Sequence, residues 1–139
     1  MEYALADTGL WYAVFDQRDP YHSEAKGKVE ILSPFHIVLP WPTVYETLRT
    51  KFVRNRVALG RFERFLMSPS VIYLDDSPFR HAAMELAFES SLKQGRPLSM
   101  VDCLVRLILE DVNIRISYLA TLNVGDFVDV CRSNRIEII

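Results

Sequence analysis

Short apolar runs alternate with longer amphipathic stretches along this chain. Runs rich in branched and aromatic residues predict buried strands at residues 3–6, 37–39, 70–74, 116–119 and 136–139. Between the strands, apolar residues recur at helical spacing. This spacing predicts helices that follow residue 7, cover 25–32, open at 42, and cover 57–67, 77–93, 100–110 and 125–131.

The predicted elements follow one another in the order βααβααβααβαβ. Strands that alternate with helices form a mostly parallel sheet, here of five strands, with helices on both of its faces. We therefore predict the α/β class and a three-layer α/β/α sandwich, in a single domain over residues 1–139. Ligands of such sheets bind outside the carboxyl ends of the strands, where the strand order reverses, so functional residues are expected there.

Composition narrows the class of protein. Half of the residues are hydrophobic and 24% are charged, without a low-complexity tract or a repeat, which excludes a disordered chain and a solenoid. No apolar stretch approaches the roughly 18 residues of a membrane helix, and the start lacks the basic region of a secretory signal. We therefore expect a cytoplasmic protein with no membrane partner. Cys103 and Cys131 lack metal-type spacing and are expected to be reduced core residues.

Acidic residues follow strands or open helices at the edge where a ligand is expected. Asp7 follows the first strand, Glu46 and Asp102 lie in the first turns of two helices, and Asp126 follows the fourth strand. Carboxylates gathered in one cleft repel one another unless a cation lies among them. Ligation by carboxylate oxygens suits Mg²⁺ or Mn²⁺, and the absence of a His or Cys cluster argues against zinc. Such an ion can position water for in-line attack on a phosphodiester.

Three of these acids also have a local structural explanation. Asp7 could serve only to stabilise the start of the helix that follows it, with Thr8 as the cap of that helix. The patterns Thr43-x-x-Glu46 and Ser99-x-x-Asp102 match or approach the capping box, in which the acid folds back onto its own backbone. Asp102 fits this explanation least well, because an ionised group on an otherwise apolar helix is costly unless a partner meets it.

Basic residues are concentrated between positions 49 and 64. This stretch holds six of the sixteen basic residues and a single acid, Glu63. The six are Arg49, Lys51, Arg54, Arg56, Arg61 and Arg64. A local positive field of this kind either binds phosphates or is only the solvated face of helices, and the pattern leaves both explanations open.

Five stretches of the chain, residues 5–13, 19–22, 43–48, 98–102 and 120–127, resemble one family. Their residue types are similar to those of PIN-domain ribonucleases, and their spacing is close to that of the VapC-type toxins of type II toxin–antitoxin systems. The resemblance covers essentially the whole chain. It implies the PIN α/β sandwich and endonucleolytic cleavage of RNA that depends on Mg²⁺ or Mn²⁺.

The resemblance also implies roles for single residues. Asp7, Glu46 and Asp102 correspond to the family's metal-holding acids, and Thr8 corresponds to the small hydroxyl residue beside the first of them. We therefore predict Asp7, Glu46, Asp102 and Asp126 as catalytic residues. Of these, Asp7, Asp102 and Asp126 are the predicted metal ligands.

The fourth acidic position departs from the commonest form of the family. Many members carry an aspartate two residues after the threonine that corresponds to Thr121, and this position is Asn123 here. An asparagine can accept a metal contact or hold a water molecule, but it adds no charge. The next acid, Asp126, is therefore taken as the fourth carboxylate. We expect Thr8, Ser99, Thr121 and Asn123 to support the site.

Three kinds of partner follow from the resemblance. It implies an RNA substrate, a homodimer and, for the toxin type, a cognate antitoxin that fills a groove near the active site. The helix that opens at residue 42 and the basic stretch after it are expected to form walls of that groove. Arg49, Lys51, Arg54 and Arg56 are expected to contact the RNA backbone.

Two other functions fit parts of the pattern. The chain would be a PIN-fold protein that only binds its ligand if Asn123 makes the cleft inert. A receiver-like signalling module would use Asp75 and Asp76 after the third strand, but it needs a lysine after the fifth strand, and the last lysine here is Lys93. RNA cleavage that requires Mg²⁺ or Mn²⁺ would favour the nuclease over both.

Overall fold

A five-stranded sheet forms the centre of the protein in a computed structural model that describes residues 2–139. Its strands are β1 (Tyr3–Ala6), β2 (His36–Pro40), β3 (Val71–Leu74), β4 (Ile116–Ala120) and β5 (Glu137–Ile138). They lie in the order β3-β2-β1-β4-β5, and all four pairings between neighbours are parallel. The predicted α/β class is confirmed, with a sheet that is parallel throughout.

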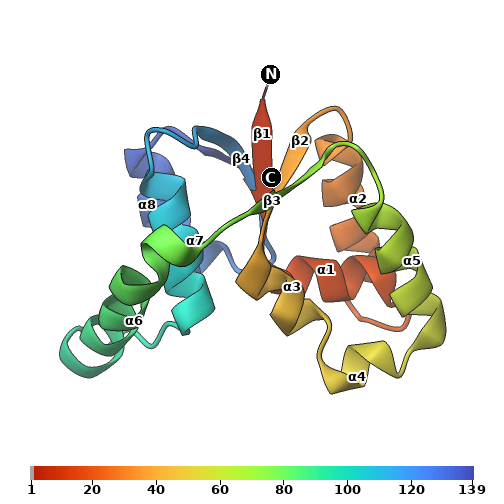
Figure 1. Ribbon diagram of the computed structural model, residues 1–139, viewed down its shortest axis with the longest axis horizontal. Coiled ribbons are helices and arrows are strands. Elements are labelled where there is room, and N and C mark those ends of the chain that lie inside the picture. The colour runs from red at the N-terminus through yellow and green to blue at the C-terminus, as the bar shows by residue number, and fades with distance from the viewer. Residues whose placement is uncertain (1) are drawn as a thin grey trace.

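Helices cover both faces of the sheet, as Figure 1 shows. One face carries α1 (Thr8–Phe15), α2 (His22–Leu32), α3 (Trp41–Thr47), α4 (Thr50–Val53) and α5 (Arg56–Leu66). The other carries η1 (Ser77–Phe79), α6 (Arg80–Phe88), the π-helical turn η2 (Glu89–Lys93), α7 (Met100–Glu110), η3 (Val124–Asp126) and α8 (Val128–Ser133). The first half of the chain thus builds one outer layer and the second half builds the other, which gives the predicted α/β/α sandwich.

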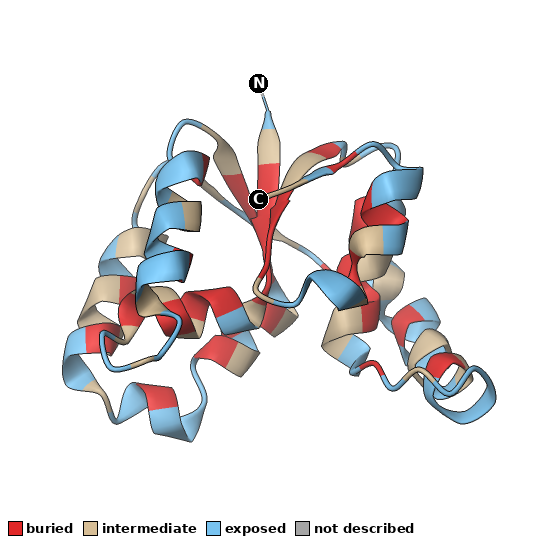
Figure 2. Ribbon diagram, turned by 180° about the vertical axis from the view of Figure 1, so that it is seen from behind, coloured by how far each residue is buried: buried red, intermediate tan, exposed pale blue. Residues whose placement is uncertain are grey.

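The central strand divides its side chains between two hydrophobic cores. Ala4 and Ala6 of β1 face the core under α1 to α5, whereas Leu5 faces the core under α6 to α8. Trp11 and Phe62 are fully buried in the first core, where burial of each ring stabilises the fold by about 1.5–3 kcal/mol. In Figure 2 the buried positions are concentrated along the strands and on the helix sides that face them.

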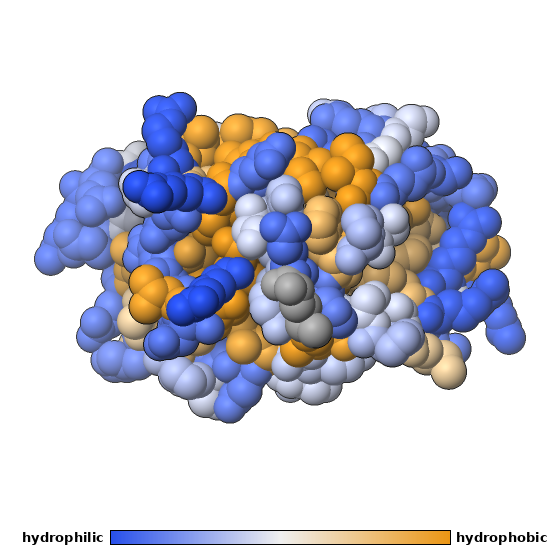
Figure 3. All heavy atoms as spheres, turned by 90° about the horizontal axis from the view of Figure 1, so that it is seen from above, coloured by the Kyte–Doolittle hydropathy of each residue, from blue (hydrophilic) through white to orange (hydrophobic). Residues whose placement is uncertain are grey.

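The surface is polar over the outer helices and more apolar towards the sheet. Figure 3 looks onto the end of the sheet where the strands begin, and hydrophilic residues gather there at the two ends of the long axis. None of the helices described between residues 2 and 139 is long and apolar enough to cross a membrane. Cys103 and Cys131 are buried and form no disulfide, as predicted, and burial raises the pKa of Cys131 to about 11.

The strand order reverses between β1 and β4. From β1 the chain builds β2 and β3 outward on one side, and then crosses to build β4 and β5 on the other side. The segments that leave β1 and β4 go to opposite faces of the sheet, since α1 lies on one face and α8 on the other. A crevice therefore opens between these two strand ends, at the position where ligands of parallel sheets bind.

Several helix boundaries differ from the predicted ones. The second helix begins at His22, before the predicted residue 25, and its first backbone groups are not capped by a side chain. The third helix begins at Trp41, one residue before the predicted start at Pro42. Pro42 fits inside the first turn, because backbone N–H groups there lack helical partners anyway. The short helix α4 was not predicted. The segment 77–93 is divided into η1, α6 and η2, and Gly95 follows it with a φ of 66°, as expected for a helix stop.

Candidate active site

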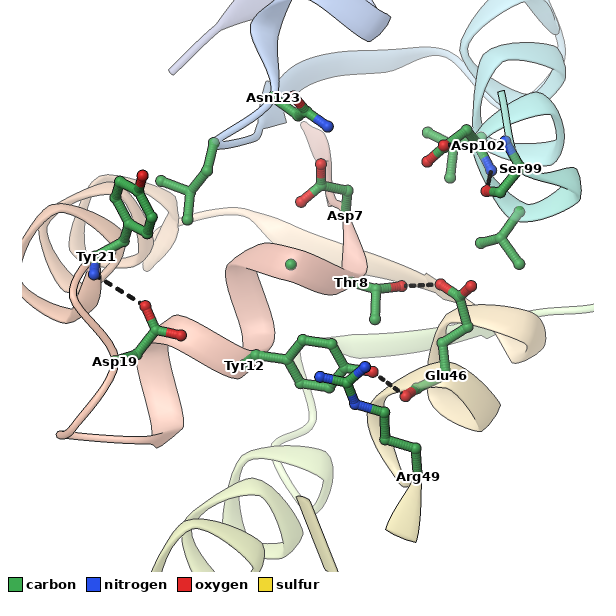
Figure 4. A pocket seen from close by; sticks show the side chains of 14 residues that line it. Asp7, Thr8, Tyr12, Asp19, Tyr21, Glu46, Arg49, Ser99, Asp102 and Asn123 are labelled. Atoms are coloured by element: carbon green, nitrogen blue, oxygen red, sulfur yellow. Dashed lines mark hydrogen bonds between the residues drawn. The ribbon is translucent and has the colours of Figure 1, made fainter. Parts of the chain in front are cut away.

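A cavity of about 780 Å³ opens at the carboxyl edge of the sheet, beside the ends of β1 and β4. Its lining comes from α1 and the residue before it, from α3, from the start of α7 and from the loop after β4. Asp7, Glu46, Asp102 and Asn123 all belong to this lining. In Figure 4 these side chains lie around a common space although they come from separate elements.

Asp7 is held at the end of β1 by two hydrogen bonds. Its Oδ1 accepts from the backbone N–H of Leu10 at 3.2 Å, which makes Asp7 the cap of α1. Its Oδ2 accepts from the hydroxyl of Thr121 at 2.5 Å. Asp7 therefore stabilises the start of α1 as expected, but Asp7 and not Thr8 is the cap, and the same carboxylate also lines the cavity.

The electrostatic setting of Asp7 is unfavourable for its charge. Burial is the largest cause that raises the pKa of Asp7, and the negative charges of Asp102 and Asp126 raise it further. The hydrogen bonds from Thr121 and Leu10 act in the opposite direction and are outweighed. A cation in the cavity would therefore stabilise the ionised form of Asp7.

Glu46 faces the cavity from α3. Its Oε1 accepts a hydrogen bond of 2.7 Å from the hydroxyl of Thr8, and its backbone carbonyl accepts one from the hydroxyl of Tyr12. The predicted capping box between Thr43 and Glu46 is wrong, because α3 begins at Trp41 and Glu46 consequently lies in its second turn. Glu46 is therefore tied to α1 and not to its own helix start.

Asp102 opens α7 and lines the cavity at the same time. The predicted capping box is confirmed, since the N–H of Asp102 donates to Ser99 Oγ at 3.0 Å and the N–H of Ser99 donates to Asp102 Oδ2 at 3.3 Å. This contact fixes the carboxylate at the rim of the cavity and uses one of its two oxygens. Asp102 therefore caps α7 and lines the cavity with the same side chain.

The loop after β4 brings Asn123, and not Asp126, to the lining of the cavity. The side-chain Nδ2 of Asn123 donates to Asp126 Oδ2 at 2.8 Å. The two residues therefore form a hydrogen-bonded pair, of which Asn123 is the member that lines the cavity. Thr121 is fully buried, and its hydroxyl accepts from the N–H of Asn123 at 2.9 Å while it donates to Asp7. Thr121 thereby links the ends of β1 and β4.

One of the four predicted RNA-contacting residues reaches the cavity. The guanidinium carbon of Arg49 lies 4.2 Å from the centre of the Tyr12 ring, and both residues belong to the lining. Lys51 on α4, Arg54 just after it and Arg56 at the start of α5 are exposed and lie away from the lining. The positive stretch therefore begins at the rim of the cavity and continues outward from it.

Among the lining residues with polar side chains, three were not predicted as part of the site: Tyr12, Asp19 and Tyr21. Tyr12 lies four residues after Thr8 on the same face of α1, so helical spacing could have identified it. Asp19 and Tyr21 lie in the turn between α1 and α2, where Asp19 Oδ1 accepts from the N–H of Tyr21 at 2.9 Å. Their place at the cavity depends on the path of the turn between α1 and α2, which the spacing of apolar residues in the sequence does not indicate.

The donor set of the cavity fits a hard divalent cation. Within residues 2–139, no three His, Cys, Asp or Glu side chains are already gathered tightly enough to hold a metal ion. Mg²⁺ does not need such a cage, because it keeps several water molecules and binds through one or two carboxylates. Asp7 and Asp102 supply oxygen donors of this kind around one cavity, and the neutral side chain of Asn123 lines it beside them.

The chain was compared with known proteins, and neither a family model nor a curated protein matches it. The fold and the site therefore define the class of this protein by themselves. It is an all-parallel α/β/α sandwich with an acidic cavity at the point where the strand order of its sheet reverses.

Proposed function

We propose that this protein is an endoribonuclease that depends on Mg²⁺ or Mn²⁺. The observation that carries the proposal is that Asp7, Glu46 and Asp102, from three separate elements, line one cavity at the carboxyl edge of the sheet. Among residues 2–139, Arg49 is the one basic side chain of that lining. An acidic cavity with a basic rim suits a metal ion inside and a phosphate backbone outside.

The residues divide the work of phosphodiester hydrolysis. A divalent cation, when bound, supplies charge neutralisation and an activated water molecule. Asp7 and Asp102 would hold the ion, and the neutral amide of Asn123, paired with Asp126, would add a further contact. Glu46, oriented by Thr8, would accept a proton from the water that attacks phosphorus, while the P–O bond to the leaving ribose oxygen breaks and that oxygen takes up a proton from solvent.

RNA approaches over the basic rim. Arg49 stacks on Tyr12 and reaches a phosphate beside the cavity. Three exposed basic residues further along the chain attract the backbone further out: Lys51, Arg54 and Arg56. These contacts position the substrate without reading its sequence. The resemblance to VapC-type toxins supports RNA as the substrate; the homodimer and the cognate antitoxin stay predictions that follow from it.

The proposal is tested by RNA cleavage with a matched pair of variants on α7. Asp102→Asn should lower the rate of cleavage by more than about 100-fold, because it removes a carboxylate that holds the ion. Glu110→Gln changes an exposed acid at the other end of the same helix and should leave the rate unchanged. EDTA should abolish cleavage, and added Mg²⁺ or Mn²⁺ should restore it.

Two results would overturn the proposal. One is wild-type protein that binds no divalent cation and cuts no RNA over a range of single-stranded and structured substrates, which would favour the binding-only alternative. The other is cleavage that persists in Asp102→Asn. The receiver-like alternative has less support, since the carboxylate of Asp76 is engaged by Arg80 and that of Asp75 by Ser77.

A further inference from the structure

Two arginines hold the η3 turn against α7. Arg96, just before α7, donates from Nη2 to the backbone carbonyl of Gly125 at 2.9 Å. Arg106, within α7, donates from Nη1 to the backbone carbonyl of Asp126 at 2.8 Å. Both arginines therefore bind main-chain oxygens of the turn that carries Asp126 and follows Asn123.

Asp129 of α8 joins the two arginines. Arg106 forms a two-pronged pair with it, with Nη1 to Oδ1 and Nη2 to Oδ2 both at 2.8 Å. Arg96 adds contacts of 3.2 and 3.4 Å to the same carboxylate. We call these three residues the arginine clamp. Two-pronged contacts between a guanidinium and a carboxylate are strong and geometrically specific, so the clamp fixes both arginines and the turn beneath them.

The arginine clamp is firmly anchored on the α7 side. The side chain of Arg106 is 13% exposed, so its charge lies largely out of water. The N–H of Arg96 donates to the carbonyl of Ser90 at 2.8 Å, and the buried hydroxyl of Ser90 donates back to the carbonyl of Arg96. Both arginines are thus held in place by contacts other than those with the η3 turn.

The arginine clamp lies next to residues that line the cavity. Arg106 lies one helical turn after Asp102, and Arg96 lies three residues before Ser99, whose side chain caps α7. The turn that the clamp holds follows Asn123, the residue that the loop after β4 contributes to the lining. The clamp therefore joins two walls of the cavity that come from different elements, and α7 and α8 lie side by side in Figure 1.

We propose that Asp129 is a positioning residue, which sets the affinity of the acidic cavity for a divalent cation by holding Asn123 and Asp126 at a fixed place relative to Asp102. The inference rests on the proposed function, because it concerns the same site. Asp129 itself lies outside the lining of the cavity. Residues that orient metal ligands from outside typically change metal affinity or activity by about 10–100-fold when mutated.

The test measures Mn²⁺ binding directly, by electron paramagnetic resonance of free Mn²⁺, on the full chain. Asp129→Asn should weaken Mn²⁺ binding by about 10-fold or more. The control is Asp76→Asn, which removes another carboxylate held by two contacts from one arginine, at 2.8 and 3.1 Å, but away from the cavity lining. Both variants should lower the melting temperature, and Asp129→Asn alone should change Mn²⁺ affinity.

A second variant and a kinetic measurement complete the test. Arg106→Lys keeps the charge but loses the planar guanidinium, so its Mn²⁺ affinity should lie between those of wild type and Asp129→Asn. If Asp129→Asn does not fold, Arg106→Lys takes its place in the test. In RNA cleavage, Asp129→Asn should need more Mn²⁺ for half-maximal rate, with a rate near that of wild type once Mn²⁺ saturates.

The outcomes separate the two proposals. A lower melting temperature with unchanged Mn²⁺ affinity in both Asp129→Asn and Arg106→Lys would show that the clamp is only structural and would overturn the positioning role. Wild-type protein that binds Mn²⁺ through Asp102 but cuts no RNA would overturn the nuclease and leave the positioning role standing. Wild-type protein that binds no Mn²⁺ would overturn both.

Discussion

The first and third strands of this sheet both lead into a buried aspartate at the same edge, and the surroundings of the two differ. Asp76, after β3, is 3% exposed and accepts two hydrogen bonds from Arg80, which hold its pKa below the usual range. Asp7, after β1, is 9% exposed and accepts hydrogen bonds from a hydroxyl and a backbone N–H. Burial raises the pKa of Asp7 instead.

The difference lies in how each charge is compensated. A buried carboxylate without a cationic partner is costly, so its retention needs a reason. The charge of Asp76 is balanced within the fold and stabilises it. The charge of Asp7 is directed into a cavity where Asp102 adds a second negative charge, which is the arrangement expected of a site completed by a bound cation.

The largest effect is expected from removing the charge of Asp7. Asp7→Asn should lower RNA cleavage by more than about 100-fold, because the buried carboxylate at the centre of the site is lost. Without divalent cations the variant should melt at the same temperature as wild type or higher. An acid with a raised pKa disfavours the folded state once the pH exceeds its unfolded pKa of about 3.9, and the variant lacks this penalty.

Thermal melts with and without Mn²⁺ check the prediction for Asp7. Wild-type protein should gain melting temperature when Mn²⁺ is added, because a ligand that binds only the folded state stabilises it, whereas Asp7→Asn should gain little. If Asp7→Asn lost as much stability as Asp76→Asn at pH 7 without added metal, the distinction between the two aspartates would be contradicted.

An intermediate effect is expected from the residue that links β4 to Asp7. Thr121→Val keeps the shape of the side chain but removes the hydrogen bond to Asp7 Oδ2 and leaves the N–H of Asn123 without its acceptor. Cleavage and Mn²⁺ affinity should fall by about 10–100-fold. Thr121→Ser retains the hydroxyl and serves as the matched control, and equal activity in both variants would exclude an orienting role for Thr121.

The smallest effect is expected at Asp76, whose charge is balanced by Arg80. Asp76→Asn should leave RNA cleavage unchanged and lower the free energy of unfolding by about 1 kcal/mol at pH 7, because Arg80 is exposed enough to be solvated alone. The pKa of Asp76 is lowered in the fold, so its contribution is present above the unfolded pKa of about 3.9 and is lost as the pH falls below it. Urea unfolding between pH 7 and pH 3 should therefore show the variant and wild type converging in acid.

Much of the fold could be predicted because it depends on local patterns. The period-two burial of β1 and the helical spacing of the segments between strands are properties of neighbouring residues. The capping box of Ser99 and Asp102 is local as well, and it was predicted and found. The box expected for Thr43 and Glu46 failed because Pro42 lies inside the first turn and the helix starts before it, an ambiguity of one or two residues that propensity does not resolve.

The sequence by itself determined that strands and helices alternate, that the sheet is mostly parallel, and that acids stand where its strands end. Only the tertiary structure decided which acids share a cavity and which partners they have. Thr8 and Glu46 are 38 positions apart, and Thr121 and Asp7 are 114 apart. Such contacts exist only because β1 lies between β2 and β4, and strand order is a property of the folded chain that no local spacing encodes.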